Sequence, residues 1–323
     1  MRFIIFGVGA VGGTLAACLA RSGNEVIGIA RGRQLAAIND SGLTLRTPDG
    51  DHRVAFECVD GPAGLDLRAD DAILFCVKSQ DTGDALASLL AAGAVNQPVF
   101  CFQNGVANER MALRHFNNVY GVSVMMPCDY ETPGVVCAYG TPRVGMFDIG
   151  RYPAGTDDMI GAMAEILEKA GMAAFPQDKV MPFKYGKLLL NLSNVLDAGF
   201  PNRESGRHWS EKARGEALAA YGAAGIEWMD VGFDDPRRAQ FMKLGTIPGA
   251  TRLGSSSRQS LLRGAGSIET NYLNGEIALL GRLNGVPVPV NAALCRIGRK
   301  LVAGVLKTGE VGDADVEAEL VAA

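Results

Sequence analysis

A glycine-rich segment close to the N-terminus restricts the fold of this chain more than any other feature. Residues 7–12 have the spacing G-x-G-x-x-G, and the run 2–6 before them is apolar after its first residue. The pattern predicts a short buried strand, a tight turn and then a helix over 10–22. A second apolar run over 25–30 predicts another strand. This order of elements predicts an α/β protein built on a mostly parallel sheet.

Each glycine of this segment has a separate physical task. Gly7 permits the tight turn, Gly9 lets the backbone approach a pyrophosphate, and Gly12 lets the helix pack closely on the strand. Phosphates would then accept hydrogen bonds from amides at the helix N-terminus. The segment predicts a Rossmann-type, doubly wound domain that binds a dinucleotide, although glycine turns in α/β proteins also occur without a ligand. The residues predicted to hold the phosphates are Gly7, Val8, Gly9, Ala10, Val11 and Gly12.

Two arginines after the second predicted strand indicate which dinucleotide binds. An NAD site usually carries Asp or Glu at this point, on the ribose 2′-hydroxyl, but residues 27–33 contain no carboxylate. Arg31 follows the strand directly and is placed to pair with a 2′-phosphate, with Arg33 as a second cation. We therefore expect NADP(H); the alternative is two solvated arginines on a loop.

Two later strands lead to polar residues. The segments 71–78 and 98–105 have the pattern of apolar strands, and they carry Lys78 and Asn104 at or near their ends. Ligands of open α/β sheets bind beyond the carboxyl ends of the strands. These two residues are therefore predicted to lie where the cofactor and the substrate meet, although either one alone would be an ordinary loop residue.

The pattern changes in the second half of the chain. Helical spacing recurs there without strand alternation, and the predicted helices cover 180–198, 208–230, 267–284 and 289–306. We expect a Rossmann-type domain over 1–175 and an all-helical domain over 176–323. The first domain should also contain strand-like stretches over 118–126 and 134–147 and a helix over 157–170. The Glu- and Ala-rich tail after Gly309 should be a frayed helix or an exposed extension.

The composition disfavours several other classes of protein. The chain has 323 residues, 48% of them hydrophobic and 20% charged, which is enough to bury a sizeable core. Its net charge of −4 gives no basic excess to hold nucleic acid. The 7 cysteines are odd in number and contain no CxxC, so we expect buried free thiols in a reducing cytoplasm. The 3 histidines lie far apart, and no metal site is expected.

The uncharged stretch 3–20 also resembles a secretion signal or a membrane span. Residues 15–18 read LAAC, which imitates a lipoprotein cleavage site. However, the glycines make one continuous helix costly, and only Met1 and Arg2 would form the charged region of a signal. We expect neither secretion nor membrane insertion.

Two polar groups interrupt the helical half. Lys187 and Asn191 are four residues apart on one helix face, with Asn194 about one turn further on. Polar residues in an apolar helix are costly unless they form hydrogen bonds or face a cleft. The second group joins the serines 255–257 to Glu269. In the alternative interpretation, Lys187 is a surface lysine and Glu269 a solvated residue of a first helical turn.

In both halves the chain resembles the ketopantoate reductase (2-dehydropantoate 2-reductase) family. The motifs that carry this resemblance are GVGAVGG near the N-terminus, Arg31, Val77-Lys78, Asn104-Gly105, KLxxN at 187–191, the serines 255–257, and 269–275 as a form of EID-x-[IL]-NG. The resemblance covers essentially the whole chain. It implies NADPH-dependent reduction of a 2-oxo acid to a 2-hydroxy acid, with ketopantoate, an intermediate of pantothenate biosynthesis, as the first candidate.

The resemblance also implies a role for each candidate residue. Lys187 would be the general acid to the developing alkoxide, and Glu269 would orient it or accept a substrate hydroxyl. Asn104 would align the substrate or the nicotinamide ribose, and Lys78 would serve the cofactor. The substrate's carboxylate and hydroxyl would be held by Asn191, Asn194 and Ser256 or Ser257. The partner would be this small acid, without nucleic acid or membrane, and a homodimer stays open.

Three departures from the family pattern lie in the helical half. The family's second helix asparagine would fall at Val195, and Asn194 carries it one residue early. The family's SSMxQD has Ser260 in place of its aspartate, and its EID reads ETN at 269–271. Two alternatives therefore stay open. One is an oxidoreductase of the same plan acting on another acid or an imine, and the other is a non-catalytic NADP(H)-binding sensor.

Overall fold

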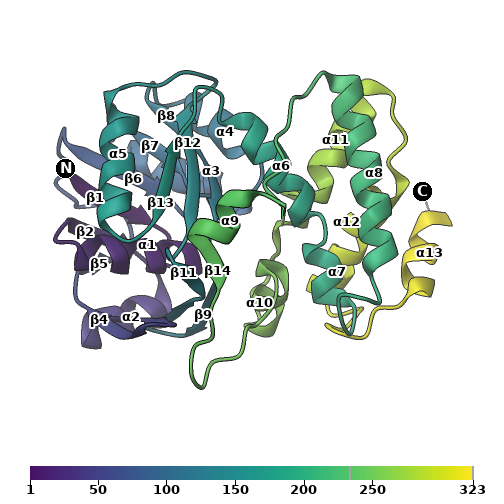
Figure 1. Cartoon of the computed structure of the whole chain (residues 1–323), viewed down its shortest axis with the longest axis horizontal. Helices are drawn as coiled ribbons and strands as arrows, with labels where there is room; N and C mark the ends of the chain where they lie inside the picture. Colours follow the sequence, from purple (N-terminus) through teal and green to yellow (C-terminus); the bar gives the residue numbers. More distant parts are fainter. Residues whose placement is uncertain (233, 322–323) are drawn as a thin grey trace. The chain divides into compact units, whose positions relative to one another are not determined.

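The computed structural model describes residues 1–232 and 234–321, and the chain divides into two compact units (Figure 1). The first, here called the Rossmann unit, comprises Met1–Lys184 and Asp230–Thr251. The second, the helical unit, comprises Tyr185–Met229 and the chain from Arg252 onward. That 1–175 and 176–323 fold as two separate domains stays a prediction. In the structure, 176–184 and 230–251 lie with the Rossmann unit.

The Rossmann unit contains a large sheet whose strand order is β13-β12-β8-β7-β6-β1-β2-β5. The strands from β5 to β8 are parallel, and β12 is antiparallel to β8. The bounds of this unit's elements are β1 (Arg2–Phe6), α1 (Ala10–Arg21), β2 (Glu25–Ile29), α2 (Gly32–Ser41), β3 (Leu43–Thr47), β4 (Gly50–Val54), β5 (Glu57–Val59), β6 (Asp71–Phe75), η1 (Ser79–Asp81), α3 (Thr82–Ala91), β7 (Val99–Cys101), α4 (Asn108–Leu113), β8 (Val119–Met125), β9 (Cys128–Thr132), β10 (Val135–Ala138), β11 (Gly140–Pro142), β12 (Met146–Arg151), α5 (Asp158–Lys169), β13 (Ala173–Pro176), α9 (Pro236–Phe241) and β14 (Met242–Leu244). The α/β prediction is confirmed. The first predicted strand, helix and second strand end within one residue of their observed bounds.

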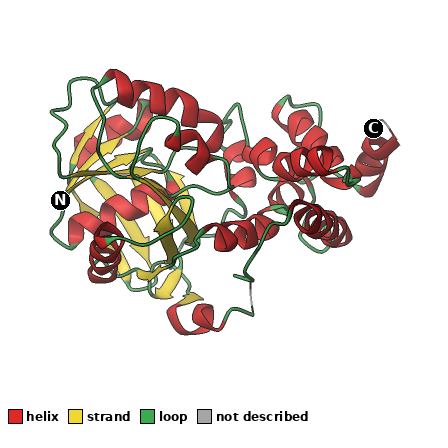
Figure 2. Ribbon diagram, turned by 90° about the horizontal axis from the view of Figure 1, so that it is seen from above, coloured by secondary structure: helices red, strands yellow, loops and turns green. Residues whose placement is uncertain are grey.

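Successive side chains of β1 enter two different hydrophobic cores, because neighbouring residues of a strand point to opposite faces of its sheet. Phe3 and Ile5 pack with residues of α1 and α5. Ile4 and Phe6 pack with residues of α3 and α4. Figure 2 shows helices on both sides of the strands. Burial on both faces explains why the parallel strands read as continuous apolar runs in the sequence.

The strand-like stretch predicted over 134–147 is three strands in three different sheets. β10 belongs to a small sheet of order β4-β3-β10-β9 that packs on α1, β11 pairs with β14, and β12 joins the large sheet. The turn between β11 and β12 explains the break: a Cβ on Gly140 would overlap the backbone carbonyls of Arg143 and Val144. An apolar pattern alone does not reveal where a strand changes sheet.

The segment 230–251 returns to the Rossmann unit through a half-buried arginine. Arg237 forms ion pairs of 2.7 Å with both Asp148 of β12 and Asp235, and its guanidinium lies 4.8 Å from the ring centroid of Phe175. Burial raises the pKa of Asp148 although the hydrogen bonds from Arg237 oppose this. These contacts attach the segment to the edge of the large sheet. The sequence carries no local signal for this return.

The helical unit is built from helices packed around an apolar core that includes Trp209 and Leu294. The bounds of its elements are α6 (Met181–Asn191, whose first turn belongs to the Rossmann unit), α7 (Asn194–Gly199), α8 (Arg207–Ala224), α10 (Ser256–Leu262), η2 (Glu269–Tyr272), α11 (Asn274–Asn284), α12 (Pro289–Val302) and α13 (Asp313–Val321). The helix predicted over 180–198 is interrupted after Asn191. The helix predicted over 267–284 is a short 3₁₀ turn followed by α11.

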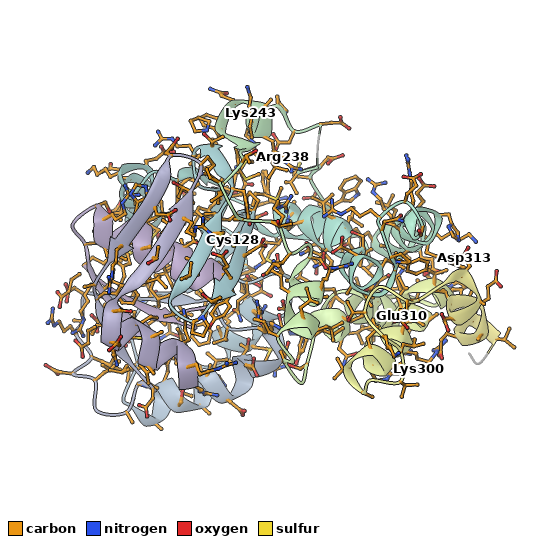
Figure 3. The ribbon with its side chains drawn as sticks, turned by 90° about the horizontal axis from the view of Figure 1, so that it is seen from below. Cys128, Arg238, Lys243, Lys300, Glu310 and Asp313 are labelled. Carbon is orange, nitrogen blue, oxygen red and sulfur yellow. The ribbon has the colours of Figure 1, made fainter. Side chains whose placement is uncertain are left out.

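The C-terminal tail forms α13, which packs on the helical unit and is held near both ends. Trp209 Nε1 donates to Asp313 at 2.7 Å, and Arg296 and Lys300 both pair with Glu319. Figure 3 labels Lys300 and Asp313 among these helices. The expectation of a frayed helix or an exposed extension is wrong, because Val316 and Glu319 are buried.

Candidate active site

The glycine loop between β1 and α1 has the shape of a phosphate cradle. Gly7 has φ +104°, which favours glycine, and a Cβ there would lie 2.8 Å from the amide nitrogen of Val77. A Cβ on Gly12 would overlap the carbonyl oxygen of Gly7. A Cβ on Gly9, in contrast, would have no described atom within 4 Å. The backbone at Gly9 is therefore open to a ligand.

The amides at the start of α1 can serve that ligand. The N-cap of α1 is Gly9, which has no side chain to bond the first amides of the helix, and the first turn carries no acidic residue. Such amides lack acceptors within their own helix, and the helix dipole favours an anion beside them. The residues therefore fit the pyrophosphate of a dinucleotide.

Arg31 lies at the N-cap of α2 and is exposed, as is Arg33. In the part of the chain that the structure describes, neither arginine forms an ion pair, and the first turn of α2 contains no carboxylate. The buried amide of Gln34 donates to the carbonyl oxygen of Val8 at 3.0 Å. This bond fixes the start of α2 to the glycine loop. Sequence reasoning missed Gln34, because a single glutamine in a polar helix carries no signal.

Lys78 and Asn104 both follow strands of the large sheet, in loops that hydrogen bonds join together. The half-buried Lys78 comes after β6, and Asn104 comes after β7. Asn108 Nδ2 donates at 3.1 Å to Ser79 Oγ and at 3.1 Å to the carbonyl oxygen of Asn104. Gln103 Nε2 also donates to the carbonyl oxygen of Val77 at 2.8 Å. The two loops therefore form one rigid edge beside the glycine loop.

A fully buried ion pair supports this edge. Lys184, in the first turn of α6, pairs with Glu109 of α4, and its Nζ also donates to the carbonyl oxygen of Gln103 at 3.0 Å. The side chains of Lys184 and Glu109 are 1% and 0% exposed. Sequence reasoning missed the pair, because its members are far apart in the chain and each resembles an ordinary charged surface residue.

Lys187 and Asn191 lie on α6 in the helical unit, as their spacing predicts. Lys187 is half-buried, and Asn191 is 5% exposed. The Asn191 Nδ2 atom is buried and has no hydrogen-bond partner among the described residues. Unmet buried donors are costly. This amide is thus ready to donate to an oxygen of a ligand.

Asn194 and the serine segment are brought together at the contact between α7 and α10. Asn194 Nδ2 lies 3.4 Å from Ser256 Oγ, and Ser255 Oγ donates to the carbonyl oxygen of Asn194 at 2.9 Å. Asp197 accepts from the backbone amide of Ser255 at 2.6 Å. Burial opposes ionisation of Asp197, but the bonds from Ser255 and Arg203 outweigh it and lower the pKa of this carboxyl. An ionised Asp197 therefore fixes the start of α10.

Ser257 and Glu269 are both buried, in α10 and in η2. The Ser257 hydroxyl has no partner among residues 1–232 and 234–321. Contact of Glu269 with Lys187 stays a prediction. The expectation that the candidates of the two units enclose one substrate also stays a prediction.

Three further findings concern the described residues. None of their helices is long and apolar enough to cross a membrane. No group of three or more His, Cys, Asp or Glu residues in that part of the chain is arranged to hold a metal ion. The cysteines of the chain are free thiols.

A mostly parallel sheet with a glycine cradle, together with a helical unit that carries a lysine, amides and hydroxyls, is typical of a nicotinamide-dependent oxidoreductase. The pattern of ketopantoate reductase PanE/ApbA matches residues 3–152, and that of its C-terminal part matches residues 189–301. The chain belongs to the ketopantoate reductase family.

Individual proteins show the same similarity. The 2-dehydropantoate 2-reductase of Archaeoglobus fulgidus is 29% identical over 312 residues, which cover 94% of this chain and 99% of the relative. The crystal structure of a PanE/ApbA family ketopantoate reductase from Ralstonia eutropha is 31% identical, has a TM-score of 0.76, and covers 94% of this chain and 99% of its own. D-mandelate dehydrogenase with NADH and anilino(oxo)acetate shares the fold at 22% identity, with a TM-score of 0.75 and coverage of 94% and 99%.

Proposed function

We propose that this enzyme reduces a 2-oxo acid to a 2-hydroxy acid with NADPH, and that ketopantoate, reduced to pantoate, is its substrate. The observation that carries the proposal is on α6. The half-buried Lys187 lies about one helical turn from a buried Asn191 amide whose donors are unmet among the described residues. A lysine that donates a proton, beside an amide that binds an oxygen, suits the reduction of a carbonyl flanked by a carboxylate.

In the proposed reaction, Lys187 donates a proton to the keto oxygen as negative charge develops there. Its ammonium group also stabilises that charge, which is the larger part of many enzymatic rate enhancements. Glu269 orients Lys187 or accepts a substrate hydroxyl. A nicotinamide held by the Rossmann unit would supply the hydride for the keto carbon. The residues that hold the substrate's carboxylate and hydroxyl are Asn191, Asn194, Ser256 and Ser257.

The Rossmann unit would bind the cofactor through the glycine loop, Arg31 and the joined loops after β6 and β7. The loop amides bind the pyrophosphate, and Arg31 pairs with the 2′-phosphate. Lys78 serves the cofactor, and Asn104 aligns the nicotinamide ribose or the substrate. The absence of ion pairs to Arg31 in the described chain leaves its guanidinium ready for a phosphate.

A second candidate function is the reduction of a different 2-oxo acid on the same plan. Val195, which occupies the place of the family's second asparagine, is 1% exposed and offers no hydrogen bond to a substrate. Ser260, in place of the family's aspartate, is buried and donates to the carbonyl oxygen of Ser256 at 2.7 Å. Both replacements lie beside the proposed substrate residues. They favour a reshaped pocket, and the fold is shared with an enzyme that binds anilino(oxo)acetate.

A substrate panel tests the proposal and separates the candidates. NADPH and NADH oxidation would be followed by absorbance with ketopantoate, its analogue lacking the hydroxyl, pyruvate and an aryl 2-oxo acid. We expect turnover with NADPH and the highest kcat/KM for ketopantoate. A preference for the aryl acid would instead support the second function. Tight NADPH binding without turnover of any acid would contradict both and favour the NADP(H)-binding sensor.

We also propose a cytoplasmic location, which the free cysteines support, because thiols persist in a reducing compartment. A homodimer stays a prediction, and light scattering of the purified chain would check it.

A further inference from the structure

The proposed substrate amides lie on either side of a break between two helices. α6 ends at Asn191, and α7 begins at Asn194. The last carbonyl groups of a helix have no amide donor within that helix, so side chains, water or bonds of a local turn bind them instead. Leu192 is the first residue after α6. The group that binds its carbonyl therefore helps to set the direction in which α7 leaves α6.

The donor to this carbonyl is Asn274, the first residue of α11. Its Nδ2 donates to the carbonyl oxygen of Leu192 at 3.1 Å and to Asn291 Oδ1 at 3.1 Å. Asn274 is 1% exposed, so no bulk water competes for these bonds. Its Oδ1 has no partner among the described residues. Asn274 thus acts on its neighbours through its NH₂ group.

The other end of this chain of bonds is anchored firmly. Asn291 Nδ2 donates at 2.9 Å to the carbonyl oxygen of Ala213 and at 2.9 Å to Glu216 Oε2. Glu216 also accepts from the backbone amides of Val290 and Asn291 at 2.8 and 2.9 Å, at the N-terminus of α12. Helices α8 and α12 therefore hold Asn291, and Asn291 in turn fixes the orientation of the Asn274 amide.

We propose that Asn274 is a positioning residue, whose amide holds the Leu192 carbonyl and thereby fixes the step that separates Asn191 from Asn194. This inference rests on the proposed function of those two amides. Because Asn194 also contacts Ser256, movement of the step would displace the serine segment as well. Lys187 lies further back on α6 and would keep its place. The inference therefore predicts weaker substrate binding and a smaller effect on the chemical step.

The first experiment compares Asn274→Ala with Asn284→Ala. Asn284 lies on the same helix, but its amide donates to the carbonyl of Leu280 within that helix. We expect Asn274→Ala to raise the KM for the 2-oxo acid by on the order of 10-fold or more, since small displacements weaken well-oriented contacts. The KM for NADPH should not change, and kcat should fall less than the substrate KM rises. Asn284→Ala should behave as the wild type.

A second variant separates positioning from general loosening. Ile277→Val removes a methyl group from a buried side chain of α11 that has no polar contact. It should lower the thermal midpoint while leaving the substrate KM unchanged. An equal rise of KM in Ile277→Val would overturn the inference, and so would an unchanged KM in Asn274→Ala.

Hydrogen exchange gives a readout that does not depend on turnover. We expect the backbone amides of 192–197 to exchange faster in Asn274→Ala, while those of 215–222 in α8 keep the wild-type rate. If the wild type reduced no 2-oxo acid, the proposed function would fail, and this exchange measurement would still decide the present inference. Unchanged exchange over 192–197 would overturn it.

Discussion

Neighbouring groups hold Asn194, one of the residues proposed to bind substrate, in place. Asn194 is held at the α7–α10 contact by Ser255 and Ser256, and Asp197 fixes the start of α10. Asn191, in contrast, keeps its Nδ2 unmet among the described residues. Of the proposed substrate residues, Asn194 and Ser256 are therefore already bonded to each other, while the Asn191 amide keeps a donor for a ligand.

The first prediction at this scale concerns Lys187. We expect Lys187→Ala to lower kcat by at least about 10²-fold, because a positioned general acid contributes roughly that much. NADPH affinity should stay near that of the wild type, since the glycine loop and Arg31 lie in the other unit. Steady-state kinetics and NADPH fluorescence titration would measure both, with the exposed Lys307→Ala as control. A kcat near that of the wild type would contradict the role of Lys187 as general acid and would favour its interpretation as a surface lysine.

The second prediction concerns cofactor choice. NADPH should bind more tightly than NADH, and Arg31→Ala should narrow the difference by about 10–100-fold, the effect of losing about 1.5–3 kcal/mol from a charged hydrogen-bonded pair. Arg21→Ala is a suitable control, because Arg21 lies at the far end of α1. Equal Kd values for both cofactors in the wild type would count against Arg31 as the determinant.

At the scale of elements, local patterns were sufficient for the cofactor half. The glycine spacing predicts the turn because Gly7 has a positive φ and because a Cβ on Gly12 would overlap the carbonyl oxygen of Gly7, five residues earlier. Alternation and apolar runs place the strands that carry Lys78 and Asn104. The spacing of Lys187 and Asn191 predicts their shared helix for the same reason, since helix geometry is local.

Features that depend on distant partners were not predictable. The return of 230–251 depends on Arg237 meeting Asp148, and the support of α6 depends on Lys184 meeting Glu109. A single sequence carries no signal for either pair. The break after Asn191 also depends on a distant residue, because the donor to the Leu192 carbonyl is Asn274 of another helix.

The buried Lys184–Glu109 pair gives a prediction for stability. Lys184→Met or Glu109→Gln alone should each destabilise the chain by about 3–5 kcal/mol, because each leaves one buried charge without its partner. The double variant should regain most of that loss. Urea unfolding of the wild type, the two single variants and the double variant would measure this recovery as a coupling free energy between the two positions. If the losses in the free energy of unfolding were additive, the two residues would not stabilise the chain as a pair.

The end of α13 gives a prediction with a pH dependence. Hydrogen bonds from Lys300 and then Arg296 lower the pKa of Glu319, while burial opposes them. Because the folded-state pKa lies below the unfolded value of about 4.3, the stabilisation is complete above that value. It is lost as pH falls through the folded-state pKa.

Glu319→Gln should therefore lower stability at neutral pH by about 1 kcal/mol, the usual order for a charged hydrogen-bonded pair with one exposed partner. The difference from the wild type should shrink below about pH 4. Thermal unfolding across pH would measure it. A constant difference between the two proteins at all pH values would contradict the ionised role of Glu319.

At the scale of the whole molecule, membership of the family bears on the reaction type, and the departures from the family pattern bear on the substrate. The Rossmann unit has a glycine loop that fits a pyrophosphate, and the chain belongs to an oxidoreductase family. The departures lie in the helical unit, at Val195, at Ser260 and in residues 269–271. The fold as a whole therefore supports the proposed reaction type. The proposed substrate depends instead on the neutral donors and acceptors of the helical unit.

The comparison of ketopantoate with its analogue lacking the hydroxyl tests that claim most directly. Buried polar groups that a substrate leaves unpaired reduce kcat/KM, and for a fully buried site the loss is about 10²–10⁴-fold. With NADPH as cofactor, we therefore predict that kcat/KM for ketopantoate exceeds that of the analogue by such a factor. A preference for the analogue, or activity on neither acid, would contradict the account.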